Sequence, residues 1–95
     1  MRRGTTPTIK ILLSNIDLDK IEKAIITIRQ NGVIINADAT VEDGYITTLL
    51  KQNETLKLHP GLAEIQVKCK LENEGVVASE IKKRPIEDIL NEDIL

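Results

Sequence analysis

Between residues 62 and 72 the chain alternates between apolar and polar side chains. The apolar positions are Ala63, Ile65, Val67, Cys69 and Leu71, and charged or amide side chains stand between them. Because successive side chains of a strand point to opposite faces, this period of two predicts a strand with one dry face and one wet face. Such a strand is typical of an antiparallel sheet that covers a core on one side.

Turn signals predict how this strand is connected. The triplet at 73–75 (NEG) predicts a turn into an extended segment at residues 76–83. The Asn31-Gly32 dipeptide tolerates the positive φ angles of a type I′ turn, so residues 24–29 and 33–37 are predicted to form a second hairpin. Further strands are expected at residues 8–14 and 45–50, and residues 51–58 are expected to form one helical turn or a connecting loop.

The stretch before Asn31 leaves an alternative open. Leu18, Ile21, Ile25 and Ile28 also fit the apolar stripe of a helix, and Asp17 is a suitable N-cap for it. The strand is favoured, because residues 25–28 (IITI) are all β-branched and the turn follows them directly.

Together these patterns predict one all-β domain over residues 1–95. About six or seven short strands with regular turns are typical of an antiparallel β-sandwich, immunoglobulin-like or jelly-roll-like, here with one short helical turn. The chain has no Trp, no Phe and one Tyr, so its core must be aliphatic. Residues 1–7 are expected to form a mobile arm or an added edge segment. Pro85 is expected to end the last strand, and residues 85–95 to form a docking segment with helix-compatible apolar spacing.

Residues for catalysis, metal binding or cofactor binding do not form a convincing set. His59 is the only histidine, and Cys69 lies on the apolar face of the predicted long strand, where a thiol serves as a small hydrophobe. The glycines are dispersed at turns. Neighbouring carboxylates in a strand point to opposite faces, which disfavours a paired acid and base. We therefore predict a protein that is not an enzyme and takes no cofactor or metal; catalysis would require a cluster assembled across strands.

Charge and hydropathy bear on the class of partner. The net charge is −2, which gives no basic footprint for nucleic acid, and one aromatic residue leaves almost nothing for bases to stack on. No apolar run approaches the roughly 18 residues of a membrane span. The single cysteine forms no internal disulfide, so folding in a reducing cytoplasm is expected.

The two ends of the chain offer surfaces for protein contacts. The basic, threonine-rich start and the apolar, acidic end either pack on the domain itself or dock on another subunit. The candidate partner-binding residues are Arg2, Arg3, Thr5, Thr6, Ile86, Ile89, Leu90 and Ile94.

Six short segments, spread along the chain, carry a resemblance to known proteins. In order they are 3–8 (RGTTPT), 26–32 (ITIRQNG), 52–56 (QNETL), 65–68 (IQVK), 77–81 (VASEI) and 89–90 (IL). By these segments, residues 2–95 resemble a family of small proteins encoded in prophages of Gram-positive bacteria, among the virion structural and tail-region proteins. The opening is also similar to that of the N-terminal module of upper baseplate proteins.

This resemblance implies a β-sandwich module without catalytic residues that helps to assemble a phage tail or baseplate. The implied partners are other phage structural proteins and further copies of the chain, and the implied location is the bacterial cytoplasm and then the phage particle. The alternative is a small phage-encoded regulatory module that masks a host protein through the acidic terminus at residues 87–95.

Overall fold

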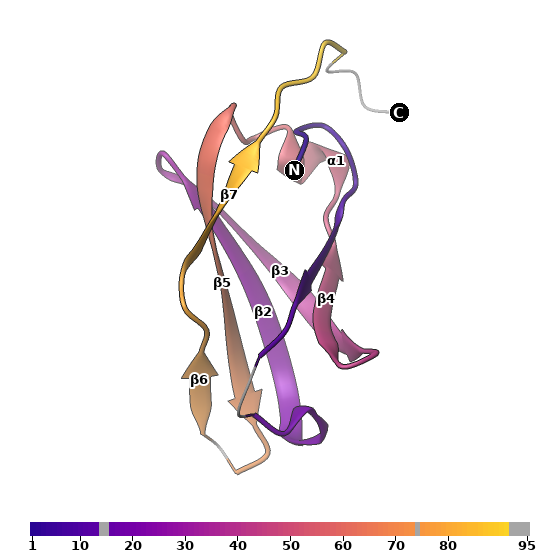
Figure 1. Ribbon diagram of the computed structural model, residues 1–95, viewed down its shortest axis with the longest axis vertical. Helices are drawn as coiled ribbons and strands as arrows, with labels where there is room; N and C mark the ends of the chain where they lie inside the picture. Colours follow the sequence, from indigo (N-terminus) through magenta and orange to yellow (C-terminus); the bar gives the residue numbers. More distant parts are fainter. Residues whose placement is uncertain (14–15, 74, 92–95) are drawn as a thin grey trace.

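The computed structural model describes residues 1–13, 16–73 and 75–91. Their fold is all-β and antiparallel, as predicted (Figure 1). Strands and helical segments follow in the order β1 (Thr8–Ile11), η1 (Leu18–Lys20), β2 (Ile21–Gln30), β3 (Val33–Glu42), β4 (Tyr45–Leu49), α1 (Gln52–Thr55), β5 (Gly61–Leu71), β6 (Val76–Ala78) and β7 (Lys82–Ile86). In this part of the chain no helix is long and apolar enough to cross a membrane.

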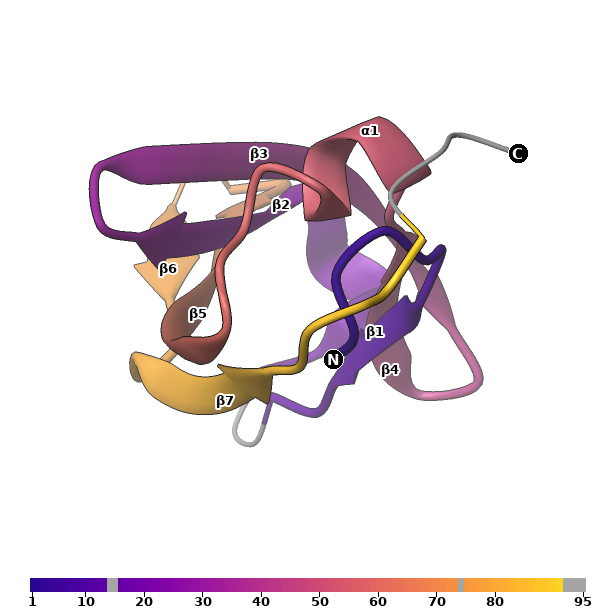
Figure 2. The ribbon, with the colours of Figure 1, turned by 90° about the horizontal axis from the view of Figure 1, so that it is seen from above.

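The strands form one curled sheet in the order β1-β4-β3-β2-β5-β6, with β7 also paired to β5. The order β1-β4-β3-β2 is that of a Greek key read against the chain direction, which is common in β-sandwiches. Strand β3 joins the two halves, because its first residues pair with β2 and its last ones, from Thr40, pair with β4. Figure 2 shows how strongly the sheet curls, with β1 and β4 across from β5 and β7.

The Asn31-Gly32 hairpin is confirmed. Both residues have positive φ angles, 45° and 84°, as a type I′ turn requires, and β2 pairs with β3 from Ala24↔Ala39 to Gln30↔Val33. The helical alternative for this stretch is wrong, because the β-branched run continues into a ten-residue strand. Only η1 is helical there, and the Asp17 side chain accepts a hydrogen bond from the Asp19 amide as its cap.

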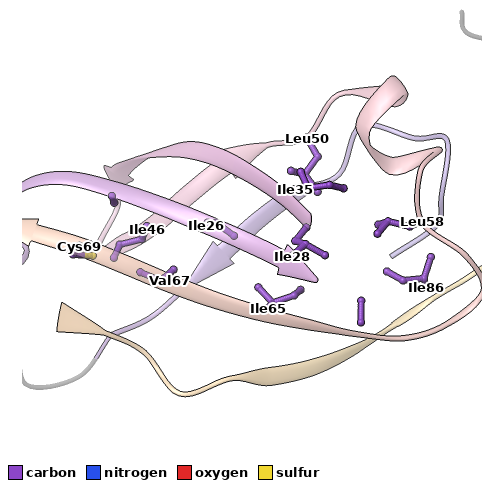
Figure 3. Close-up of a cluster of buried hydrophobic side chains, with 12 residues drawn as sticks. Ile26, Ile28, Ile35, Ile46, Leu50, Leu58, Ile65, Val67, Cys69 and Ile86 are labelled. Carbon is purple, nitrogen blue, oxygen red and sulfur yellow. The ribbon is translucent and has the colours of Figure 1, made fainter. Parts of the chain in front are cut away.

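The predicted long strand is confirmed as β5, and its dry face forms part of the core. Ala63, Ile65, Val67 and Cys69 are all buried. Side chains from β2, β3, β4 and β7, and from the loops that carry Leu50 and Leu58, meet them (Figure 3). The core consists of Ala24, Ile26, Ile28, Ile35, Ile46, Leu50, Leu58, Ala63, Ile65, Val67, Cys69 and Ile86. It is aliphatic apart from the thiol, as the composition requires.

The return from β5 differs from its prediction. Residues 76–83 were expected as one extended segment, but β6 ends at Ala78 and β7 begins at Lys82. Both pair with the same edge of β5. Pro85 does not end a strand; it lies within β7, opposite Leu62. Proline is tolerated there because β7 is an edge strand and the missing N–H would point away from β5.

The C-terminal segment is not helical over its described residues 87–91. Ile86 is in the core, Ile89 is half-buried and Leu90 is exposed. Apolar spacing alone was a poor guide here, because the backbone of Glu87 is bonded to the N-terminal residues instead of to a helical turn.

Candidate protein interaction site

The two ends of the chain are joined by backbone pairing. The Met1 amino group donates to the Pro85 carbonyl at 2.8 Å. The Glu87 amide donates to the Met1 carbonyl at 2.7 Å, and the Arg3 amide donates to the Glu87 carbonyl at 3.0 Å. These bonds make a short parallel bridge. We call residues 1–3 together with 85–88 the terminal clasp.

Gly4 turns the chain out of the terminal clasp toward β1. Its φ angle is +75°, which favours glycine, and a Cβ atom there would lie 3.0 Å from Cδ2 of Leu56. The position therefore admits no larger residue without displacing Leu56.

Arg3 anchors the terminal clasp to the domain. Its side chain is only 10% exposed. Nε donates to the Leu58 carbonyl at 2.8 Å and Nη2 to the Leu56 carbonyl at 2.9 Å, while Nη1 lies 3.4 Å from Oδ1 of Asp88. The guanidinium thus donates hydrogen bonds to the carbonyls of Leu56 and Leu58, which follow the end of α1 and accept no bond from a further helical turn.

Several predicted partner-binding residues are therefore occupied within the chain. Residues 1–7 are not a mobile arm; as in the alternative of an added edge segment, residues 1–3 pair with Glu87. The Thr55 hydroxyl also holds this stretch, because it donates to the Thr5 carbonyl at 2.8 Å. The Thr5 hydroxyl donates to the Arg2 carbonyl at 2.6 Å. Arg2 is paired with Glu87 at 2.8 Å but remains half exposed.

The remaining candidates are divided. Ile86 is in the core and is not available to a partner. Ile89 lies close to Gly4. Thr6 and Leu90 are exposed and remain available, and Ile94 lies outside the described residues.

Beyond the terminal clasp the two edges of the curled sheet face each other across a cleft. One edge is β1, and the other is formed by residues 79–84 (Figure 2). The cleft has a volume of about 280 Å³, and its apolar lining includes Ile9 and Ile11 of β1, Ile65 of β5, and Met1, whereas residues 79–84 contribute only polar and charged side chains. We call this cleft the seam.

Two cations of β7 lie on the core side of the sheet at the seam. Lys82 pairs with Ile65 and Arg84 with Ala63, and paired residues share a face. Both Ile65 and Ala63 are buried, yet Lys82 and Arg84 are exposed, since none of the described strands pairs with β7 on the side away from β5. Lys10 adds a third cation to the seam lining, against one carboxylate, that of Glu80.

Backbone groups of both edges point into the seam. The Leu50 amide donates to the Pro7 carbonyl at 3.0 Å. Hydrogen-bonded and non-bonded pairs alternate in antiparallel ladders, so Ile9 is bonded to β4 while Thr8 and Lys10 direct their N–H and C=O groups toward the seam. The same alternation applies to β7. The N–H and C=O groups of Glu87 bond to residues 1–3, on the side away from β5. The N–H and C=O groups of Lys83, four residues earlier, therefore also point away from β5 and into the seam. The Lys83 carbonyl accepts a bond from Nη1 of Arg84.

The sequence offered one overlooked signal for this cleft. Residues 82–84 (KKR) have no apolar position, although they pair with the alternating strand β5. Three successive strand residues without an apolar side chain, next to a strand with a dry face, indicate a part of the edge where the sheet is not covered.

His59 and Cys69 lie in separate environments. The His59 side chain is exposed, and the His59 backbone is fixed by the Gln30 amide, with two bonds of 2.7 Å. Cys69 is buried. Among residues 1–13, 16–73 and 75–91, no three His, Cys, Asp or Glu side chains gather as metal ligands.

Cys69 is expected to react slowly with thiol reagents. Burial removes the thiol from water and raises its pKa, and the thiolate is the reactive form. Modification at about pH 8 should therefore be at least about a hundredfold slower in the folded chain than in urea. Equal rates, followed by absorbance of the released thiol product, would contradict the buried placement of Cys69.

Known proteins do not add to this description. The protein-family models, the curated proteins and the solved structures give no match to the chain. What the chain does is therefore inferred from its own residues and geometry, and the resemblance to phage structural proteins stays a prediction.

Proposed function

We propose that the chain is a non-enzymatic assembly module that acts through protein–protein contacts, as a structural component of a phage tail or baseplate. The observation that carries the assembly role is the seam, where Thr8, Lys10 and the Lys83 amide point away from the strands that β1 and β7 pair with in the described residues. Exposed strand edges are surfaces to which other chains add. The phage assignment rests on the resemblance of the sequence segments.

The outer face of the sheet supports the same function. It carries exposed apolar side chains on several strands, including Ile34 on β3, Tyr45 and Leu49 on β4, and Leu62 on β5. In an assembly such side chains can be buried against neighbouring subunits, other virion proteins or further copies of this chain.

The regulatory alternative has less support from the geometry. It requires a free acidic terminus, but Glu87 and Asp88 face Arg2 and Arg3 in the terminal clasp. A partner that used these two carboxylates would first have to separate them from their arginines.

The test is to follow a tagged chain through phage assembly. After induction of the prophage, particles and assembly intermediates are separated on a density gradient and labelled for electron microscopy. The proposal predicts the tag at the tail or baseplate, and recovery of morphogenesis proteins with it. Absence from both particles and intermediates, with recovery of a host enzyme or polymerase, would refute it in favour of the regulatory alternative.

A further inference from the structure

The seam has a direction in which one more strand fits. All pairs along β1-β4-β3-β2-β5-β7 are antiparallel, so β1 and β7 run in opposite directions. A single strand between them is therefore parallel to one edge and antiparallel to the other. Residues 1–3 already take such a path at one end of the seam, because they pair in parallel with residues 85–87.

A strand in line with residues 1–3 would meet backbone partners on both sides. On the β7 side it would reach Lys83, and on the β1 side Thr8 and Lys10, whose peptide groups point into the seam by the alternation described above. About four residues of added strand would match the length of β1, which is four residues.

The side chains around the seam set the chemistry of this strand. Ile9, Ile11 and Ile65 provide apolar contacts, while Lys10, Lys82 and Arg84 oppose only Glu80. On a chain with a net charge of −2, this local excess of positive charge favours acidic side chains on the partner. Arginine and lysine also form charge-assisted hydrogen bonds to carboxylates.

We infer that the seam binds an extended, acidic segment of a partner protein that also carries apolar residues, as a strand between β1 and β7. The inference rests on the proposed function, because it names the surface and the chemistry by which the assembly module holds its partner.

The experiment titrates the folded chain with a capped six-residue peptide of alternating glutamate and valine. Binding is followed by NMR, together with hydrogen exchange of the Thr8, Lys10 and Lys83 amides. We expect saturable binding, exchange of these amides slowed at least about tenfold, and affinity at least about tenfold weaker for the peptide with lysine in place of glutamate.

Charge-reversed variants separate the seam from general electrostatics. Lys82→Glu with Arg84→Glu should weaken binding of the glutamate peptide at least about tenfold. The control is Lys23→Glu with Lys70→Glu, a pair of exposed cations facing each other on β2 and β5. This control makes the same change in net charge and should alter affinity less than about twofold.

Three results would overturn the inference. The first is no binding of the glutamate peptide at millimolar concentration. The second is binding that the Lys82→Glu, Arg84→Glu variant does not weaken. The third is self-association of a Lys82→Val, Arg84→Val variant while the peptide does not bind, which would mean that the cations only prevent strand addition at this edge.

Failure of this inference is distinguishable from failure of the proposed function. If the tagged Lys82→Glu, Arg84→Glu variant enters phage particles as the unmodified chain does, the seam is not the binding surface and the assembly function stands. If the unmodified chain is absent from particles, the assembly function fails regardless of peptide binding.

Discussion

Replacement of Ile26 by alanine is expected to lower the free energy of unfolding by about 3 to 4 kcal/mol. Ile26 is fully buried on β2, where it pairs with Ala37 of β3 and Val67 of β5. These neighbours lie in fixed strands and cannot easily fill the space of the lost side chain. Because small domains have only about 5 to 15 kcal/mol of stability, this is a large fraction of the total.

Ile34→Ala is the matched control for Ile26→Ala. The side-chain change is identical and Ile34 also lies in the sheet, but it is 59% exposed. The loss should stay below about 1 kcal/mol. Urea unfolding of the two variants measures both values. Similar losses for Ile26→Ala and Ile34→Ala would mean that the core does not lie on the face described above.

Replacement of Arg3 by alanine is expected to lower the free energy of unfolding by about 2 to 3 kcal/mol. The guanidinium is nearly buried, and its two bonds to the carbonyls of Leu56 and Leu58 are 2.9 and 2.8 Å long. Its removal leaves carbonyls without these donors and loosens the terminal clasp. Arg3→Lys should recover little, because one ammonium group does not reproduce the forked geometry of the guanidinium.

Arg2→Ala tests whether burial is the cause of this effect. Arg2 is adjacent, of the same type, and paired with Glu87 at 2.8 Å, but its side chain is 53% exposed. An exposed ion pair contributes about 0 to 1 kcal/mol, so the loss should be small. Thermal or urea unfolding distinguishes the variants. Equal losses for Arg2→Ala and Arg3→Ala would contradict the anchoring role of Arg3.

The sequence predicted those parts of the fold that depend on local pattern. Strand β5 follows from its alternation and the β2–β3 hairpin from Asn31-Gly32, because side-chain period and turn chemistry act between residues close in sequence. The distinction between strand and helix at residues 21–28 was also local, since β-branched residues pack well in a sheet.

The features that make the site were not local, and the sequence did not predict them. The burial of Arg3 depends on the carbonyls of Leu56 and Leu58, more than 50 residues away. Pro85 was expected to end a strand, because nothing near it in sequence reveals that its nitrogen faces away from β5. The exposure of Lys82 and Arg84 on the core side depends on the strand order, which places β1 opposite them without pairing.

Amide hydrogen exchange of the free chain tests the open seam most directly. Thr8, Lys10 and Lys83 should exchange at least about tenfold faster than Ile9 and Arg84, whose amides are directed to β4 and β5, although all five lie on the same edge strands. If Thr8, Lys10 and Lys83 are instead protected to the same extent as Ile9 and Arg84, then β1 and β7 are paired, the sheet is a closed barrel, and no seam exists to receive a partner.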